Sequence, residues 1–341
     1  MSSIKILYLS ESRLGSKSAN AIQVKSMCSA FANNGYEVEV LCLTGSNENI
    51  DDVKQIKGPK LLLFFRIWAF IKILATNYKN KKTIIYGRSY VVQCLLSMIG
   101  IKSYLELHTN ERDVFFKNLL FYLSRKKNLI FVPISTPIIK YMKLQNFKYI
   151  VAHDGHSNNK SFIKTLKRND NRLNIGYFGK LSERKGIKLL MYLDKLKSND
   201  FKLHIFSPDN QRYDEFSNRV SLGYLSHNKV YDHMKKMDVL LLPIQSVKHR
   251  DYSTFTSPLK LFEYASVGRL ILLSDVQSLR DLKFPLGIYK CKSEKHWEET
   301  LKLIKKENIH LNNKILKTIH DWSQNYSWDS RVNKILNNEF D

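Results

Sequence analysis

Short apolar runs alternate with longer amphipathic stretches from one end of the chain to the other. Residues 4–10 form an apolar run typical of a buried strand, residues 21–34 have helical spacing and stop before Gly35, and residues 37–43 form the next run. A glycine just after the last helical residue is a common helix terminator. Parallel strands need crossover connections, which are usually helices. The alternation therefore predicts an α/β protein built on parallel sheets.

The same pattern predicts the remaining elements. A helix is expected to open at Ser135-Thr136-Pro137, with a hydroxyl as cap and a proline in the first turn. Helices are also expected over residues 186–197 and 312–338, the latter with a break near residues 326–327. Further strands are expected at residues 83–86, 103–107, 129–133, 173–178, 202–206, 220–222, 239–243 and 270–273.

The chain divides into two similar halves around a polar, basic stretch at residues 158–174. The strand–loop–helix pattern restarts after this stretch, so it is the best candidate for a domain boundary. We expect a first Rossmann-like domain over residues 1–165, a second over residues 166–325, and a C-terminal helix over residues 326–341 that crosses back to the first domain. The expected architecture is two parallel α/β sheets facing each other across a cleft.

Charge and cysteine content narrow the class of protein. Among 341 residues, 55 Lys and Arg face 31 Asp and Glu, a net charge of +24 that favours anionic partners, although abundant Lys from coding bias is an alternative reading. The four cysteines show no CxxC pair, which fits a reducing compartment. The chain also lacks a signal-like apolar region or an apolar stretch of about 18 residues, and we expect a cytoplasmic protein.

The segment STFTSPLKLFEYASVG, residues 253–268, contains a helix start that suits an anion. Ser257 is placed to cap the helix, and Pro258 has no amide hydrogen to leave unpaired. The first-turn amides near Leu259 and Lys260, with the positive end of the helix dipole, suit a phosphate. Glu263, further inside, can accept hydrogen bonds from a diol such as ribose. A capped surface helix is the alternative.

The segment GYFGKLSERKG follows the first strand of the second half. Gly179 permits a sharp exit from the strand, and Lys180 and Lys185 flank the loop that follows. Two ammonium groups that converge on a diphosphate would neutralise the charge of a departing nucleoside diphosphate. A solvated basic turn is the alternative.

A third segment, YLELHTNERD, places His108 at the end of an apolar strand. Ligands of open parallel sheets gather outside the carboxyl ends of the strands, so His108 is a candidate functional residue, with a purely structural role as the alternative. The chain has no Asp-x-Asp and no HExxH, and we expect no metal site. It also lacks the G-x-G-x-x-G fingerprint of dinucleotide-binding enzymes, which argues against an NAD-dependent dehydrogenase.

Residues 61–75, LLLFFRIWAFIKILA, are apolar on nearly every face and are flanked by lysines. This composition suits a helix in a membrane interface, or a helix packed on the first sheet, and both hold if one edge stays exposed. Residues 115–127 form a second basic and aromatic stretch with the same two readings.

Taken together, these segments resemble the family 4 (group 1) glycosyltransferases, which have the two-domain GT-B fold. The resemblance covers nearly the whole chain. It includes the opening ILYLS and ANAIQVKSMCSAFANNGYEVEVL, the His153-Asp154-Gly155 segment, GYFGKLSERKG, SPLKLFEYASVGRLILLSD and Tyr326-Ser327-Trp328. No single motif is decisive, and the resemblance rests on the order and spacing of all of them.

The resemblance implies roles for individual residues. Lys180 and Lys185 would hold the donor diphosphate, Glu263 would bind the ribose, and the amides around residues 257–260 would grip phosphate and sugar. Leu225 would line the base pocket. His108 would face the donor sugar beside the Gly15 loop. One departure stands out, because the family often has a second glutamate eight positions before Glu263, and this chain has Phe255 there.

The implied activity is a retaining, metal-independent hexosyltransferase that needs no cofactor beyond its nucleotide-sugar donor. The acceptor would be a glycan or a lipid-linked molecule in the assembly of a bacterial surface polysaccharide. The basic first domain would dock on an anionic membrane surface at the inner face of the plasma membrane. Two alternatives stay open: a sugar-nucleotide epimerase or phosphorylase of the same architecture, and a basic nucleic-acid-binding protein. No helix-turn-helix, RNP or finger pattern supports the latter, so we expect no nucleic-acid partner.

Overall fold

The chain divides into two units. The computed structural model describes residues 4–14, 19–44, 50–77, 83–108, 120–124, 128–157, 161–164, 172–196, 199–207, 216, 219–222, 227–245, 252–255 and 257–337. Unit 1 comprises Met1–Asp154 and Trp328–Asp341, and unit 2 comprises Gly155–Ser327. The division therefore comes before the polar stretch that suggested a boundary at residue 165. A bridge between His156 and Ser327 joins the two ends of unit 2.

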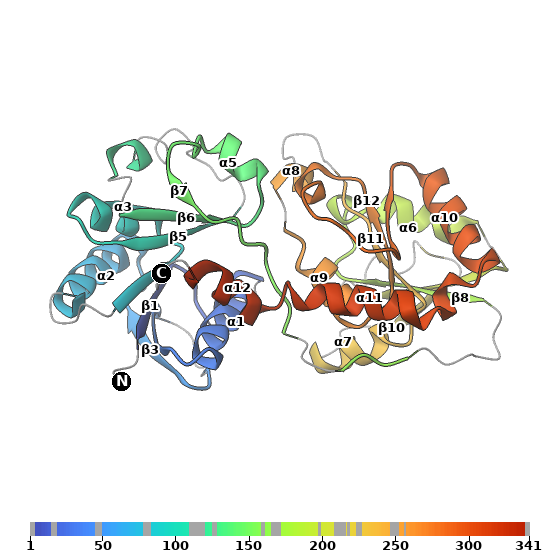
Figure 1. Ribbon diagram of the computed structural model, residues 1–341, viewed down its shortest axis with the longest axis horizontal. Coiled ribbons are helices and arrows are strands. Elements are labelled where there is room, and N and C mark those ends of the chain that lie inside the picture. The colour runs from blue at the N-terminus through green and yellow to red at the C-terminus, as the bar shows by residue number, and fades with distance from the viewer. Residues whose placement is uncertain are drawn as a thin grey trace. The chain divides into compact units, whose positions relative to one another are not determined.

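Unit 1 is built on a seven-stranded sheet in the order β3-β2-β1-β4-β5-β6-β7, and every pairing is parallel (Figure 1). The expected strands are present with ends that differ by at most a residue, and β3 and β7 are additional. The strands are β1 (Lys5–Ser10), β2 (Glu37–Leu43), β3 (Val53–Gly58), β4 (Thr83–Gly87), β5 (Ser103–Leu107), β6 (Leu129–Pro133) and β7 (Lys148–Tyr149).

The helices of unit 1 follow the predicted crossovers. They are α1 (Ala19–Asn33), α2 (Leu62–Asn77), α3 (Tyr90–Met98), α5 (Pro137–Tyr141) and α12 (Trp328–Leu336). Gly35, with φ of +84°, lies just after α1 in the left-handed region that favours glycine. The helix expected at Pro137 does begin there, but the Thr136 side chain forms no capping hydrogen bond. The proline, whose fixed φ suits the first turn, is therefore the feature that marks this helix start.

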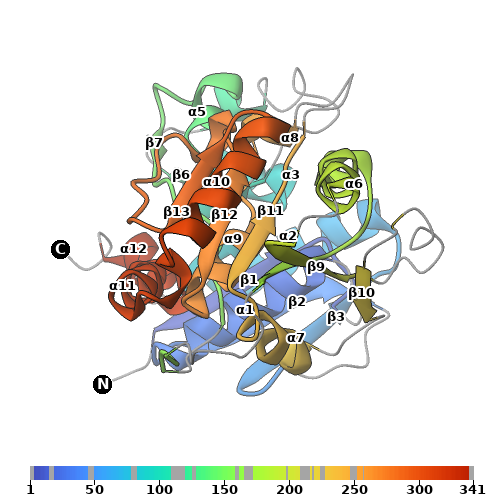
Figure 2. The same ribbon diagram turned by 90° about the vertical axis from the view of Figure 1, so that its right-hand side faces the viewer.

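Unit 2 repeats this plan with a six-stranded parallel sheet in the order β10-β9-β8-β11-β12-β13. Helices lie on both of its sides: α6 contacts α10 on one, and α9 contacts α11 on the other (Figure 2). The strands are β8 (Leu173–Phe178), β9 (Phe201–Phe206), β10 (Arg219–Leu222), β11 (Val239–Leu242), β12 (Leu270–Ser274) and β13 (Ile288–Cys291). The helices are α6 (Ile187–Lys195), α7 (His227–Met234), α8 (Tyr252–Phe255), α9 (Leu259–Ser266), α10 (Glu294–Lys306) and α11 (Asn313–Gln324), with 3₁₀ turns η1 (Glu183–Lys185), η3 (Gln277–Leu279) and η4 (Ile309–Leu311).

Both sheets reverse their strand order at one point. In unit 1 the chain runs outward from β1 to β3 and then returns to the other side of β1 with β4, and unit 2 does the same with β8 and β11. Loops that leave the two central strands diverge at such a switch point and form a crevice outside the carboxyl ends of the strands. Ligand-binding residues are therefore expected after β1 and β4 in unit 1 and after β8 and β11 in unit 2.

All four cysteines are buried and none forms a disulfide. Within the described part of the chain, every helix is too short or too polar to cross a bilayer.

Arg331 fixes the C-terminal helix to the rest of unit 1. α12 packs along α1 (Figure 1), and the buried Arg331 guanidinium donates to the carbonyl oxygens of Ala152 and of His153, the latter at 2.5 Å. It also lies 3.5 Å from the carboxylate of Glu106 and 3.8 Å from that of Asp154. The helix therefore closes a charged cluster as well as an apolar face.

We expect Arg331→Met to destabilise the protein by about 3 kcal/mol, because it leaves buried carboxylates with fewer positive partners. The free energy of unfolding, measured by urea denaturation, tests this. Asn333→Ala, an exposed change on the same helix, is the control and should stay within about 0.5 kcal/mol of the wild type. Equal stability of Arg331→Met and Asn333→Ala would contradict the proposed anchoring.

Candidate functional site

The loop after β8 leaves the sheet at the switch point of unit 2. The Gly179 amide still donates to the Phe206 carbonyl of β9 at 2.8 Å, and Gly179 has φ of +148°. The Tyr177 hydroxyl then donates to the Lys180 carbonyl at 2.6 Å, which fixes the backbone of the basic loop. The Lys180 side chain itself is exposed.

The far end of this loop is held against the end of β11. Gly186, with φ of +70°, is the N-cap of α6, and a Cβ atom there would lie 2.3 Å from the Pro243 Cβ. The Gln245 amide also donates to the Arg184 carbonyl at 3.2 Å. Only glycine fits this close approach. The last glycine of the GYFGKLSERKG segment is therefore needed where the loop packs against Pro243 at the end of β11. The exposed Lys185 side chain thereby lies at the switch point.

Helix α9 brings a third segment to the same place. The Phe178 amide at the end of β8 donates to the Tyr264 hydroxyl at 3.1 Å, which holds the helix across this strand end. The helix begins at Leu259 with Pro258 as its N-cap, so the prediction that Ser257 caps it is wrong: no side-chain capping bond forms. Proline lacks an amide hydrogen, and the first-turn amides of Leu259 and Lys260 have no intrahelical acceptor.

Lys260 lies one helical turn before Tyr264 on α9. Its Nζ is 1.7 Å from the position that a Cβ atom on Gly179 would occupy, and 5.2 Å from the centroid of the Tyr177 ring. Burial and the neighbouring Lys185 ammonium lower the pKa of Lys260 to about 7, and the Glu263 carboxylate opposes them in part. The sequence indicated only the backbone amide of Lys260 for this site, whereas the structure also brings its side chain there, close to Gly179.

Glu263 lies on the same helix and completes this group. It is half-buried, and its charge adds to the effect of burial in raising the pKa of Tyr231. The structure thus brings Gly179, Lys185, Lys260 and Glu263 together at one edge of the second sheet. Ser257 is buried just before the helix. Gly15 and Leu225, also predicted to bind the donor, lie outside the described residues.

Phe255, which replaces the acidic residue common in the resembling family, is buried at 8% exposure. It belongs to α8, which contacts η3 within unit 2. An aromatic side chain in such a position supplies apolar packing and no hydrogen-bond acceptor to a sugar.

His108 belongs to a charged cluster at the carboxyl end of β5 in unit 1. Its ring contacts the Glu106 carboxylate, which also accepts from Arg88 at 2.7 Å and from the Tyr86 hydroxyl at 2.5 Å. Burial alone would raise the pKa of Glu106, but Arg88, Arg331 and His108 hold it well below its usual range. The His108 ring therefore contacts the ionised, fully buried carboxylate of Glu106.

Charge pairing, rather than metal binding, best explains this cluster. One ligand atom each from Glu106, His108 and Asp154 lies within 4.8 Å of the others, a spacing that an ion can bridge. Arg88 and Arg331 already pair with Glu106, and Arg331 also lies near Asp154. A divalent cation would meet two guanidinium groups at this position, so the donor set does not suit it.

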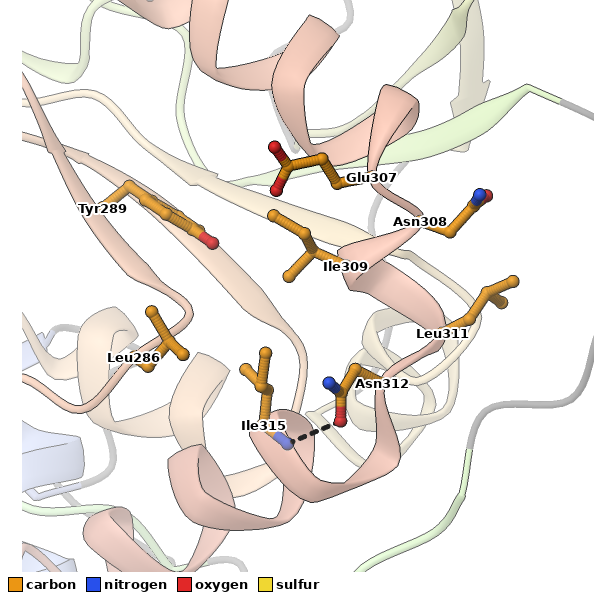
Figure 3. Close-up of a pocket in the computed structure, with 8 residues that line it drawn as sticks. All are labelled: Leu286, Tyr289, Glu307, Asn308, Ile309, Leu311, Asn312 and Ile315. Carbon is orange, nitrogen blue, oxygen red and sulfur yellow. Dashed lines mark hydrogen bonds between the residues drawn. The ribbon is translucent and has the colours of Figure 1, made fainter.

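A separate hollow of about 590 Å³ lies on unit 2 between β13 and the start of α11 (Figure 3). Asn312, in its wall, accepts a hydrogen bond from the Ile315 amide at 3.3 Å and so caps α11. None of its lining residues is basic, and one is acidic, so it does not suit a diphosphate. The lining residues are Leu286, Tyr289, Glu307, Asn308, Ile309, Leu311, Asn312 and Ile315.

Comparisons with known proteins identify the fold. No family model matches the chain, and no curated protein matches its sequence. Among solved structures, sucrose-phosphate synthase from Thermosynechococcus elongatus is 13% identical, with a TM-score of 0.69 and 98% of each chain covered. A glycosyltransferase from Rickettsia africae is 11% identical, with a TM-score of 0.70 over 99% of this chain and 98% of its own.

A third similar structure contains a nucleotide sugar. Anabaena HepE in complex with UDP-glucose is 12% identical, with a TM-score of 0.68 over 98% of this chain and 99% of its own. The likeness spans the whole chain in each case and confirms the expected GT-B fold, two Rossmann-like units with parallel sheets.

The lowered pKa of Lys260 predicts a pH-dependent stability. Between about pH 7 and 10 the unfolded chain binds a proton at this lysine that the folded chain does not, so the wild type gains stability as pH rises. Lys260→Met lacks this gain, and its stability relative to the wild type should fall between pH 7 and 9, by less than about 1.4 kcal/mol per pH unit.

Urea denaturation at pH 7, 8 and 9 measures this difference. Leu259→Ala, a neutral change in the same turn, is the control, and its difference from the wild type should not vary with pH. A pH-independent difference for Lys260→Met would contradict the lowered pKa.

Proposed function

We propose that the protein is a glycosyltransferase that moves a sugar from a nucleotide-diphosphate donor to an acceptor hydroxyl. The observation that carries the proposal is the gathering of Lys185, Lys260 and the start of α9 at the switch point of the second sheet of a GT-B fold. Positive charge and free helix amides at this edge suit a diphosphate. Lys180, at the start of the same loop, would add a further ammonium group.

The main contribution of this site to sugar transfer would be electrostatic stabilisation of the leaving diphosphate. As the bond between the sugar and the diphosphate breaks, negative charge builds on the leaving group, and fixed ammonium and amide groups stabilise it. Glu263 would accept hydrogen bonds from the ribose hydroxyls. We assign no nucleophile, in line with a retaining front-face displacement, and no metal.

The role of unit 1 is proposed to be acceptor binding, with His108 directed at the donor sugar. The anchoring of His108 on Glu106 supports a fixed ring orientation. A uridine nucleotide is the first donor to test, because HepE was solved with UDP-glucose. A thermal-shift screen with UDP, GDP, ADP and their glucose conjugates, followed by assay of nucleotide release with glycan and lipid-linked acceptors, tests the proposal.

Removing either charged side chain should weaken donor binding. With the nucleotide that raises the melting temperature most, we expect Lys185→Met and Glu263→Gln to lose the shift, since one removes a diphosphate contact and the other a ribose contact. The loss of one charged hydrogen bond costs about 1.5–3 kcal/mol, or roughly 10- to 150-fold in affinity. Melting temperature against ligand concentration measures it.

Lys188→Met is the matched control, because Lys188 is exposed on α6, near the same loop, and pairs only loosely with Glu183 at 3.9 Å. It should respond to the nucleotide as the wild type does. If Lys185→Met and Glu263→Gln also respond like the wild type, the assignment of the site is wrong.

The first unit also carries a surface suited to a membrane. α2 buries Phe65, Ala69 and Ile73 against the sheet, so the expectation that it packs there is confirmed. Its opposite face is nevertheless exposed. The exposed apolar stripe consists of Leu63 at 66%, Phe64 at 57%, Ile67 at 51% and Ile71 at 60% exposure. We propose that this stripe, preceded by exposed Lys57 and Lys60, docks on anionic lipid at the inner face of the plasma membrane.

Leu63→Asp combined with Ile71→Asp should reduce binding to phosphatidylglycerol vesicles on the order of tenfold, because it removes buried apolar area from the contact. Co-sedimentation at low salt measures the bound fraction. Leu303→Asp, on α10 of unit 2 and 43% exposed in the wild type, is the control and should bind as the wild type does. Recovery of the wild type mostly in the supernatant would refute membrane docking.

A further inference from the structure

The Lys260 ammonium group lies against the backbone of Gly179, in space that a side chain at that position would occupy. A Cβ atom on Gly179 would coincide with this ammonium group, at 1.7 Å, and the Tyr177 ring lies beneath it at 5.2 Å. Because the Tyr264 hydroxyl bonds the end of β8, the turn of α9 that carries Lys260 is fixed over the loop. The position is therefore built by three elements, β8, its loop and α9.

The groups that face Lys260 leave positive charge in excess. Lys185, from η1, repels the charged form of Lys260, and burial disfavours it further. Glu263, one turn further along α9, attracts this charged form, but its effect is smaller than that of burial and Lys185 together. Tyr177, from β8, offers a ring face, and its hydroxyl is already bonded to the Lys180 carbonyl. The Lys185 and Lys260 ammonium groups therefore repel each other in a partly desolvated site, and an anion placed between them would relieve the repulsion.

We propose that Lys260 is a third lysine of the diphosphate site and that it takes up a proton when the diphosphate binds. The inference rests on the proposed function, since it concerns the same ligand. Lys260 lies in the first turn of α9, so its side chain and the turn's amides serve one phosphate group. In the free protein the amine is largely neutral above pH 7, and the bound dianion favours its charged form.

Proton uptake has a direct thermodynamic signature. With a pKa near 7, about nine in ten Lys260 amines are neutral at pH 8, so binding should take up close to one proton per nucleotide. By linkage, the affinity then falls up to about tenfold per pH unit between pH 7 and 9. The terminal phosphate, with a pKa near 6, is already ionised in this range and contributes little.

Isothermal titration of UDP into the protein at pH 8, in HEPES and in Tris, measures the uptake from the difference in observed heat. GDP and ADP replace UDP if the thermal-shift screen selects them. We expect uptake near one proton for the wild type and for the Lys188→Met control. Lys260→Arg, whose side chain stays charged, should bind with little uptake and with an affinity nearly independent of pH from 7 to 9.

The possible failures are distinct. Binding without proton uptake by the wild type would overturn the role of Lys260 and leave the glycosyltransferase proposal intact. Uptake that persists in a folded Lys260→Met variant would assign the proton to another group and also overturn it. If none of the three nucleoside diphosphates binds the wild type, the proposed function fails, and the role of Lys260 fails with it.

Discussion

The parallel arrangement of both sheets is the constraint on which the candidate sites depend. Every strand of a parallel sheet ends at the same edge, and the reversal of strand order opens a crevice there. In unit 2 this brings together the loop after β8, the end of β11 and the start of α9, although they are far apart in the sequence. Gly186 against Pro243 and Gly179 against Lys260 show how closely these segments approach, and the contact with the rigid Pro243 ring depends on the absence of a side chain at Gly186.

The two units differ in how the charges at this edge of the sheet are balanced. In unit 1, Glu106 pairs with Arg88 at 2.7 Å and lies 3.5 Å from Arg331, and these guanidinium groups balance its buried charge. In unit 2, burial and the repulsion from Lys185 disfavour the charged form of Lys260 more than Glu263 favours it. A balanced cluster fixes a side chain such as His108, whereas an excess of one sign creates affinity for a ligand of the other. The first arrangement suits positioning and the second suits binding of an anion.

The sequence predicts the central strands well and the edge strands less well: the edge strand β10 was expected, whereas β3, β7 and β13 were not. β2, β5, β6 and β8 match their expected bounds because each is mainly apolar. β3, with the sequence VKQIKG, is half polar since it lies at an edge of the sheet, and the two-residue β7 is too short to give a pattern. Lys185 and Glu263 were expected at the site from the motifs that contain them, and their roles there stay predictions. The sequence does not indicate that the Lys260 side chain lies against Gly179, because the two belong to distant segments, and the Arg331 contact with Glu106 joins residues that no local pattern relates.

The lowered pKa of Lys260 means that the free protein carries an unfavourable charge arrangement at pH 7. Such an arrangement persists in a fold only where the rest of the structure imposes it, and here the bond from Phe178 to Tyr264 and the core around α9 do so. A lysine free to move would turn toward solvent and regain its ordinary pKa. A fixed, partly neutral lysine gains more from an arriving dianion than an exposed one does, because both the repulsion and the desolvation of its charged form are offset at once. The unfavourable charge of the free site and the affinity that we propose for a diphosphate therefore have the same physical origin.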